Sequence, residues 1–232
     1  MSPSIFSSVG TMRRTHPAPA DLETIMNQAA TFGGGNGRNF SVALVAGVAS
    51  RCPHGAPRVL LCRPLRGCEP FPTSFWLSCP HLLRVAARIE GRNGVSGMED
   101  FLSRREADWR RYNLLHAVLR MSMIPLERRK FMRLHRRRIY ESLRLRGVGG
   151  VSCSPGPIFV KCVHLQVASY LGMGCHPASE WIERNIEEWS CEAGVCMTER
   201  SRGLENPGRL RARDGIFALQ SAFLRERRRS CQ

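Results

Sequence analysis

The sequence has almost no lysine and no long apolar run. Its 35 basic residues include only two lysines, Lys130 and Lys161, so arginine carries nearly all of the positive charge. No stretch reaches the roughly 18 consecutive apolar residues of a membrane-spanning helix. Residues 1–26 have neither the apolar segment nor the small-residue cleavage site of a secretory signal. We therefore expect a cytoplasmic protein, with an organellar matrix as the alternative if the source has organelles.

The motifs of common enzyme families are missing as well. The glycine-rich stretch GGGNG at 33–37 lacks the Lys-Ser/Thr ending of a phosphate-binding loop, and no strand precedes it. GVGGV at 147–151 follows a predicted helix, which indicates a hinge or turn rather than a dinucleotide fingerprint. The usual hydrolase and kinase signatures are not present. The sequence alone therefore predicts no reaction.

Cysteine, by contrast, is abundant, with ten residues. Without a secretory signal, these residues are expected as reduced thiols, metal ligands or core residues rather than as a disulfide framework. Zinc prefers four Cys and His ligands in a tetrahedron. We predict a structural zinc site, with scattered core cysteines as the alternative. The predicted ligands are Cys162, His164, Cys191 and Cys196.

Basic residues greatly outnumber acidic ones in the sequence. The formal net charge is +16, and residues 125–146 contain nine Lys or Arg against two Glu. A solvated helix face usually mixes signs at i,i+4 spacing, and this stretch does not. We therefore predict a surface for an anionic partner, with nucleic acid favoured and a plain solvated face as the alternative. The predicted anion-binding residues are Arg128, Arg129, Arg133, Arg136, Arg137 and Arg138.

The apolar pattern predicts an α+β fold. Runs rich in β-branched and aromatic residues indicate three strands, the first two forming a hairpin around the turn SRCPHGAP. From residue 80 the apolar period becomes helical. We expect a small antiparallel sheet of about three strands packed under four to five helices, with flexible termini. The expected strands lie near 40–49, 58–65 and 73–79, and the expected helices at 80–90, 97–123, 124–147, 158–174 and 176–190.

These elements suggest one domain with extensions at both ends. Residues 1–38 are expected as a disordered lead and residues 39–197 as a single α+β domain. Residues 198–232 are expected as a basic tail with room for one last helix. The sheet should also bring Cys52, Cys62 and Cys79 near one another.

The segment VKCVHLQVASYLGMGCHPASEWI, residues 160–182, places reactive side chains among apolar ones. On one helix, residues two positions apart point about 200° apart, so we expect Cys162 and His164 not to act as a pair. Two interpretations stay open. The side chains fill the core, or they serve a metal-dependent or Cys/His-dependent enzyme that acts on a phosphate-bearing substrate. The catalytic candidates for the second case are Lys161, Cys162, His164 and His176.

Several motifs stand in order along the chain: Arg51, Cys52 and Pro53; Pro70, Phe71, Pro72 and Thr73; Lys161, Cys162 and His164; and Gly174, His176 and Pro177. Together they resemble a bacterial family known as domain of unknown function 501, in which a leucine stands in place of Val163. The resemblance covers roughly residues 40–197 and implies a shared fold, but it implies no activity. It also places a site where the segment from Lys161 to His176 meets the turn at Cys52 and the loop at 70–73.

Overall fold

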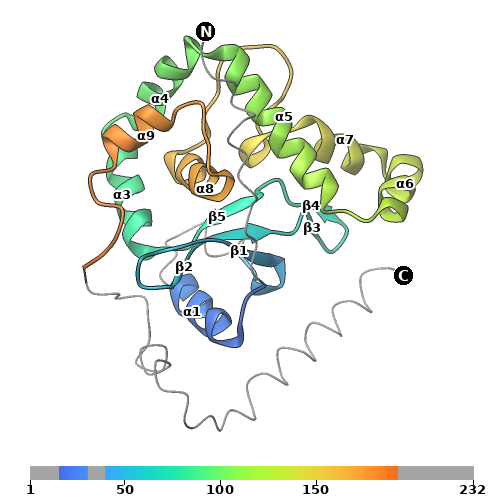
Figure 1. Ribbon diagram of the computed structural model, residues 1–232. Coiled ribbons are helices and arrows are strands. Elements are labelled where there is room, and N and C mark those ends of the chain that lie inside the picture. Colours follow the sequence, from blue (N-terminus) through green and yellow to red (C-terminus); the bar gives the residue numbers. More distant parts are fainter. Residues whose placement is uncertain (1–15, 31–39, 193–232) are drawn as a thin grey trace, which may run out of the picture.

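A three-stranded antiparallel sheet lies at the centre of the protein (Figure 1). The computed structural model describes residues 16–30 and 40–192. The strands lie in the order β1-β2-β5, so the predicted hairpin and third strand are confirmed. Within the described residues, eight α-helices accompany the sheet, and the predicted α+β class is confirmed. The strands are β1 (Val45–Arg51), β2 (Pro57–Cys62) and β5 (Phe75–Leu77), and a short ribbon is formed by β3 (Leu65–Arg66) and β4 (Glu69–Pro70).

The central strand β2 is buried on both faces. Val59 and Leu61 belong to the main core, which includes helix α8 (Val163–Met173). Leu60 points to the other face and packs with Ile25 of helix α1 (Pro19–Ala30). Successive side chains of a strand alternate between the two faces. This alternation explains why the sequence of β2 is a continuous apolar run.

Helix α1 covers the second face of the sheet (Figure 1). Ile25 is fully buried, and Asp21 forms an ion pair of 2.6 Å with Arg51 at the end of β1. The structure therefore differs from the expected disordered lead at residues 19–30. The glycine-rich stretch at 33–37 lies between this helix and the first strand in the sequence, which favoured a separate lead. The apolar surface that α1 covers belongs to the sheet, so the sequence of α1 alone does not indicate it.

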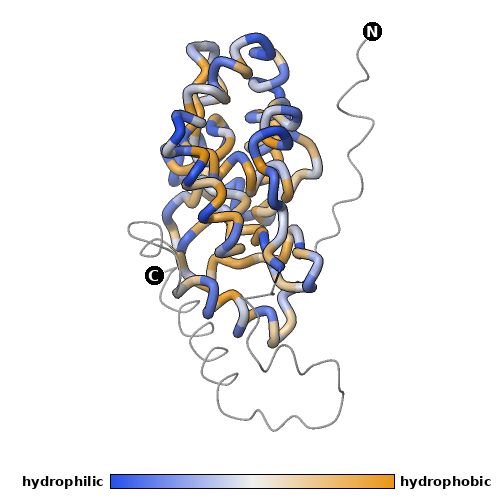
Figure 2. Tube along the Cα trace, turned by 90° about the vertical axis from the view of Figure 1, so that its left-hand side faces the viewer, coloured by the Kyte–Doolittle hydropathy of each residue, from blue (hydrophilic) through white to orange (hydrophobic). Residues whose placement is uncertain are grey.

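Most of the other helices surround the main core, with α8 lying directly on the sheet (Figure 1). Gly172 of α8 permits this approach, because a Cβ built there would lie 2.3 Å from the ring of Phe75. Figure 2 shows hydrophilic and hydrophobic segments alternating along the helices. The additional helices are α3 (Pro80–Glu90), α4 (Gly94–Ser103), α5 (Glu106–Ser122), α6 (Leu126–His135), α7 (Arg137–Leu145) and α9 (Ser179–Asn185), with short 3-10 turns at Val42–Leu44 and Val148–Gly150.

Two of the long helices expected from the sequence are each divided. The helix predicted at 97–123 is interrupted before α5, and the one predicted at 124–147 is interrupted at Arg136. Arg136 has φ −135° and ψ 49°, which no α-helix contains, so α6 and α7 meet at an angle there. Met132 and Leu143 pack together across this junction. The junction at Arg136 therefore determines which arginines of α6 and α7 face one another.

Arg120 fixes α7 to the rest of the domain. Its side chain is 1% exposed and has no carboxylate partner among the described residues. Nη1 donates to the carbonyls of Leu143 (3.0 Å) and Arg146 (2.7 Å), at the end of α7. Nη2 donates to the carbonyls of Pro72 (2.9 Å) and Gly147 (2.7 Å). Carbonyl groups at the C-terminal end of a helix carry partial negative charge, which suits a cation.

The GVGGV motif is a turn packed against α5. A Cβ at Gly147 would lie 2.0 Å from Asn113 Oδ1, and the Val148 amide donates to that same oxygen at 2.9 Å. Gly149 and Gly150 have φ of 58° and 91°, values that favour glycine. The motif therefore acts as a close-packed turn, as the sequence predicted.

Candidate functional site

Helix α8 begins later than the sequence predicted. Residues 158–162 are not helical, and Cys162 caps α8 with an extended backbone of φ −168° and ψ 157°. The expectation that Cys162 and His164 point apart was therefore wrong, because it assumed one continuous helix. Their ligating atoms and a carboxylate oxygen of Glu90 all lie within 4.8 Å of one another. This group could hold a metal ion.

Glu90 is the residue that organises this group. It lies at the end of α3, and its Oε1 accepts hydrogen bonds from the backbone amides of Val163 (2.6 Å) and His164 (3.2 Å). The same oxygen lies 2.7 Å from His164 Nδ1. A carboxylate at the start of a helix satisfies free N–H groups and suits the positive end of the helix dipole. Glu90 could not be identified as a partner from sequence pattern, because it is 74 residues from His164.

The His164 ring is held from both sides. Its Nε2 lies 3.1 Å from the carbonyl oxygen of Leu83, an acceptor, so this nitrogen donates. Histidine ligands of metals typically donate their second ring nitrogen to a carbonyl or carboxylate in this way. Nδ1 is therefore the ring atom that faces Glu90 and Cys162. Burial raises the pKa of the Cys162 thiol; Glu90 acts in the same direction, and Lys161 opposes it.

Of the other two predicted zinc ligands, Cys191 does not join this group. The carbonyl oxygen of Cys191 lies 2.7 Å from Nε2 of His54, in the turn between β1 and β2. Cys196 lies outside the described residues. Of the cysteines expected to meet, Cys52 and Cys79 flank the first residues of β2, whereas Cys62 is buried at its far end.

His176 belongs to the core rather than to an open site. Its Nδ1 accepts from the Ala178 amide at 2.9 Å, and its Nε2 therefore donates to Gln166 Oε1 at 2.9 Å. Burial lowers the pKa of His176 to about 3. Gln166 lies two residues after His164, and residues two apart on a helix point about 200° apart, so His176 contacts a face of α8 that His164 does not share. Lys161 is exposed, so the four catalytic candidates do not line one pocket.

A second polar group lies inside the core. The Tyr112 hydroxyl lies 2.6 Å from Ser169 Oγ, which lies 2.7 Å from His116 Nε2. All three residues are at most 2% exposed. Burial, and secondarily the charge of Arg120, lowers the pKa of His116 to about 3. This spacing resembles a nucleophile and its base, but complete burial identifies it as a satisfied polar core.

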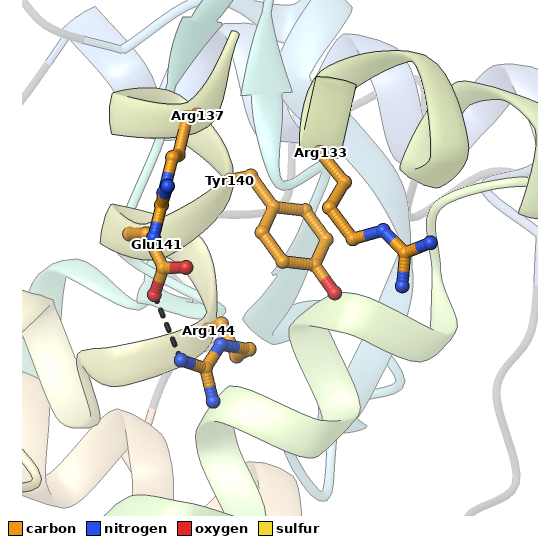
Figure 3. A pocket seen from close by; sticks show the side chains of 5 residues that line it. All are labelled: Arg133, Arg137, Tyr140, Glu141 and Arg144. Carbon is orange, nitrogen blue, oxygen red and sulfur yellow. Dashed lines mark hydrogen bonds and ion pairs between the residues drawn. The ribbon is translucent and has the colours of Figure 1, made fainter. Parts of the chain in front are cut away.

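The arginine-rich helices form an open hollow of about 410 Å³ (Figure 3). Figure 3 shows Tyr140 between Arg137 and Arg133, with Arg144 and Glu141 alongside. Glu141 and Arg144 form an ion pair of 2.8 Å. Arg137, Tyr140, Glu141 and Arg144 lie on one face of α7, and Arg133 reaches over from α6.

The structure separates the six predicted anion-binding residues. Arg133 and Arg137 line the hollow, whereas Arg128 donates to the carbonyl of Gly67 at 3.0 Å. Arg129 is half-buried, and its Nε has no hydrogen-bond partner. Arg144 and Tyr140 were not among the predicted anion-binding residues, although both follow Arg137 at helical spacing (i+7 and i+3). Arg136 and Arg138 are exposed outside the hollow.

Comparison with known protein families matches residues 48–184 to a family described as protein of unknown function (DUF501). The chain is a member of the DUF501 family. The resemblance seen in the sequence is thereby confirmed. The DUF501 region runs from within β1 to the last turn of α9, so it contains both the Glu90 group and the hollow. No curated protein and no solved structure matches the chain.

Two further observations concern the described part of this DUF501 chain. Among residues 16–30 and 40–192, no helix has the length and apolar character needed to cross a membrane. The motifs that resemble the family carry structural contacts: Arg51 pairs with Asp21, Pro72 accepts from Arg120, and His176 caps the turn before α9.

Proposed function

We propose that this DUF501 protein is a non-enzymatic binding protein that holds nucleic acid on the surface of α6 and α7. The observation that carries the proposal is the convergence of Arg133, Arg137 and Arg144 around one open hollow. Guanidinium groups donate in pairs to phosphate oxygens, and phosphate backbones are the commonest polyanions that proteins bind.

The charge balance of α6 and α7 supports an anionic partner. No ion pair within the described part of the chain involves Arg133, Arg136, Arg137 or Arg138. Like charges that lie close together repel one another and destabilise the helices that carry them. A bound phosphate backbone would remove this repulsion and release counterions.

The proposal is tested by fluorescence anisotropy with labelled DNA and RNA. The double variant Arg133→Ala/Arg137→Ala should weaken binding at least tenfold, because each phosphate contact by a charged donor is worth about 1.5 kcal/mol or more. The matched control is Arg84→Ala/Arg88→Ala, which removes the same charge from exposed positions of α3. Equal losses in both variants would contradict a localised site and leave only non-specific attraction.

We also infer that Glu90, Cys162 and His164 bind a zinc ion. The ligand atoms around a tetrahedral zinc lie roughly 3.3–3.8 Å apart, so the group, with its atoms within 4.8 Å, needs only a small closure. The Leu83 carbonyl already orients the imidazole for ligation through Nδ1. Zinc would replace the proton between His164 and Glu90 and the proton of the Cys162 thiol.

An enzyme built on the four catalytic candidates has less support. His164 faces Glu90, whereas His176 is buried in the core against Gln166. Lys161 is exposed. Burial raises the pKa of Cys162, whereas a cysteine nucleophile needs a lowered one.

A further inference from the structure

The hollow between α6 and α7 holds more positive charge than one internal phosphate neutralises. Three arginines and one glutamate line it, which leaves a formal charge of +2. Arg144 is already paired with Glu141, so the excess belongs to Arg133 and Arg137. An internal phosphodiester carries one negative charge, whereas a phosphate monoester carries about −1.5 to −2 at pH 7. The charge of the hollow therefore matches a monoester.

The donors of the hollow approach from more than one direction. Arg133 comes from α6, and Arg137 and Arg144 come from α7, on the other side of the junction at Arg136. A terminal phosphate presents three free oxygens to such an arrangement. An internal phosphate presents two, and its strand continues on both sides. The geometry thus favours the end of a strand over its middle.

Tyr140 adds a neutral donor and a flat surface to the same place. Its ring is half-buried beside Ile124, Met132 and Leu143, and it lies between Arg133 and Arg137 in Figure 3. Aromatic rings beside basic grooves stack nucleobases without regard to their sequence. A volume of about 410 Å³ is that of a small-molecule pocket, large enough for one nucleotide.

We infer that the hollow binds the terminal phosphate monoester of a nucleic-acid strand, with Tyr140 contacting the terminal nucleotide. Arg133 and Arg137 hold the phosphate, and Arg144 supports it while paired with Glu141. This inference rests on the proposed nucleic-acid binding by α6 and α7 and narrows it to strand ends.

The test compares single-stranded oligonucleotides of about 16 nucleotides that share one sequence and carry a 5′-phosphate, a 3′-phosphate or neither. Full-length protein should bind a phosphorylated end at least tenfold more tightly than the unphosphorylated strand, as expected for one added charge-assisted contact. Arg133→Ala and Arg137→Ala should abolish this preference. Arg88→Ala on α3 should retain it.

The possible results distinguish the strand-end inference from the broader proposal of nucleic-acid binding by α6 and α7. If all three oligonucleotides bind equally, and both Arg133→Ala and Arg137→Ala weaken all of them, the strand-end inference is overturned and the nucleic-acid surface stands. If none binds, both proposals are overturned. If AMP competes as tightly as the phosphorylated oligonucleotide, the site serves free nucleotides, which also overturns the inference. Weak competition by AMP, with a retained phosphate preference, supports it.

Discussion

Glu90 Oε1 lies 2.7 Å from His164 Nδ1 and joins the end of α3 to the start of α8. The same oxygen also accepts from two backbone amides of α8. The Glu90 carboxylate thus satisfies two amides at the start of α8 and positions the His164 imidazole beside Cys162. The arrangement places a carboxylate, a thiol and an imidazole at one point, and the zinc proposal depends on it.

Metal content should follow these three residues. Protein purified without chelators should contain one zinc per chain by elemental analysis, and Cys162→Ser and His164→Ala should lose it, since each removes a ligand. Cys191→Ser should keep its zinc, because Cys191 lies outside the Glu90 group. Loss of zinc from Cys191→Ser with retention in His164→Ala would contradict the assignment.

Replacing Arg120 should strongly destabilise the fold. Arg120→Met removes four hydrogen bonds to carbonyls and leaves buried acceptors unsatisfied, so we expect a loss of about 3 kcal/mol or more in the free energy of unfolding. Urea denaturation measures this loss. Arg88→Ala, at an exposed site, should change stability by less than about 0.5 kcal/mol. Equal effects would show that Arg120 contributes no more than a surface arginine.

The close approach of α8 to the sheet should depend on Gly172. Gly172→Ala places a Cβ 2.3 Å from the ring of Phe75, and the resulting overpacking should cost about 1–3 kcal/mol. Gly156→Ala is the matched control, because a Cβ there meets nothing within 4 Å. Thermal unfolding of both variants checks the difference. A Gly172→Ala protein as stable as Gly156→Ala would contradict the packing described for α8.

The buried histidines should make the protein acid-sensitive. Burial lowers the pKa of His116 and of His176 to about 3, so both are neutral in the folded protein. In the unfolded chain they protonate near pH 6.5, so the unfolded state binds more protons and stability falls as pH drops below about 6.5. Between pH 7 and 5, each histidine should account for a loss of about 2 kcal/mol.

The measurement for this prediction is urea denaturation at pH 7, 6 and 5. Carboxylates contribute little over this range because they titrate at lower pH. His176→Gln should show a shallower decline than the unmodified protein, whatever its stability at pH 7. A decline of equal slope in the variant would exclude His176 as a source of the acid sensitivity.

The sequence predicted what depends on local pattern. The strands around the turn at Cys52 and the helical period after residue 80 were correct, because alternation and periodicity are local signals. The start of α8 was misplaced, since Glu90, which caps it, is distant in sequence. Helix α1 was missed for the same kind of reason, because the apolar surface that Ile25 covers belongs to β1 and β2.

The sequence likewise predicted only some of the residues of each candidate site. Cys162 and His164 were named as ligands, but a spacing rule for helices could not identify Glu90 as their partner. The arginine surface was evident from composition, whereas the hollow depends on the junction at Arg136, where backbone conformation changes within an unbroken helical pattern. Tertiary packing of Met132 against Leu143 overrides local propensity there.

The most direct test of the proposed function is the salt dependence of single-stranded nucleic-acid binding. The logarithm of the binding constant falls with the logarithm of the salt concentration, with a slope of about −0.7 per neutralised phosphate. Arg133→Ala/Arg137→Ala should reduce the magnitude of that slope by about 1.4, and Arg84→Ala/Arg88→Ala should leave it unchanged. The same slope in all three proteins would contradict the claim that the arginines of α6 and α7 hold the phosphates.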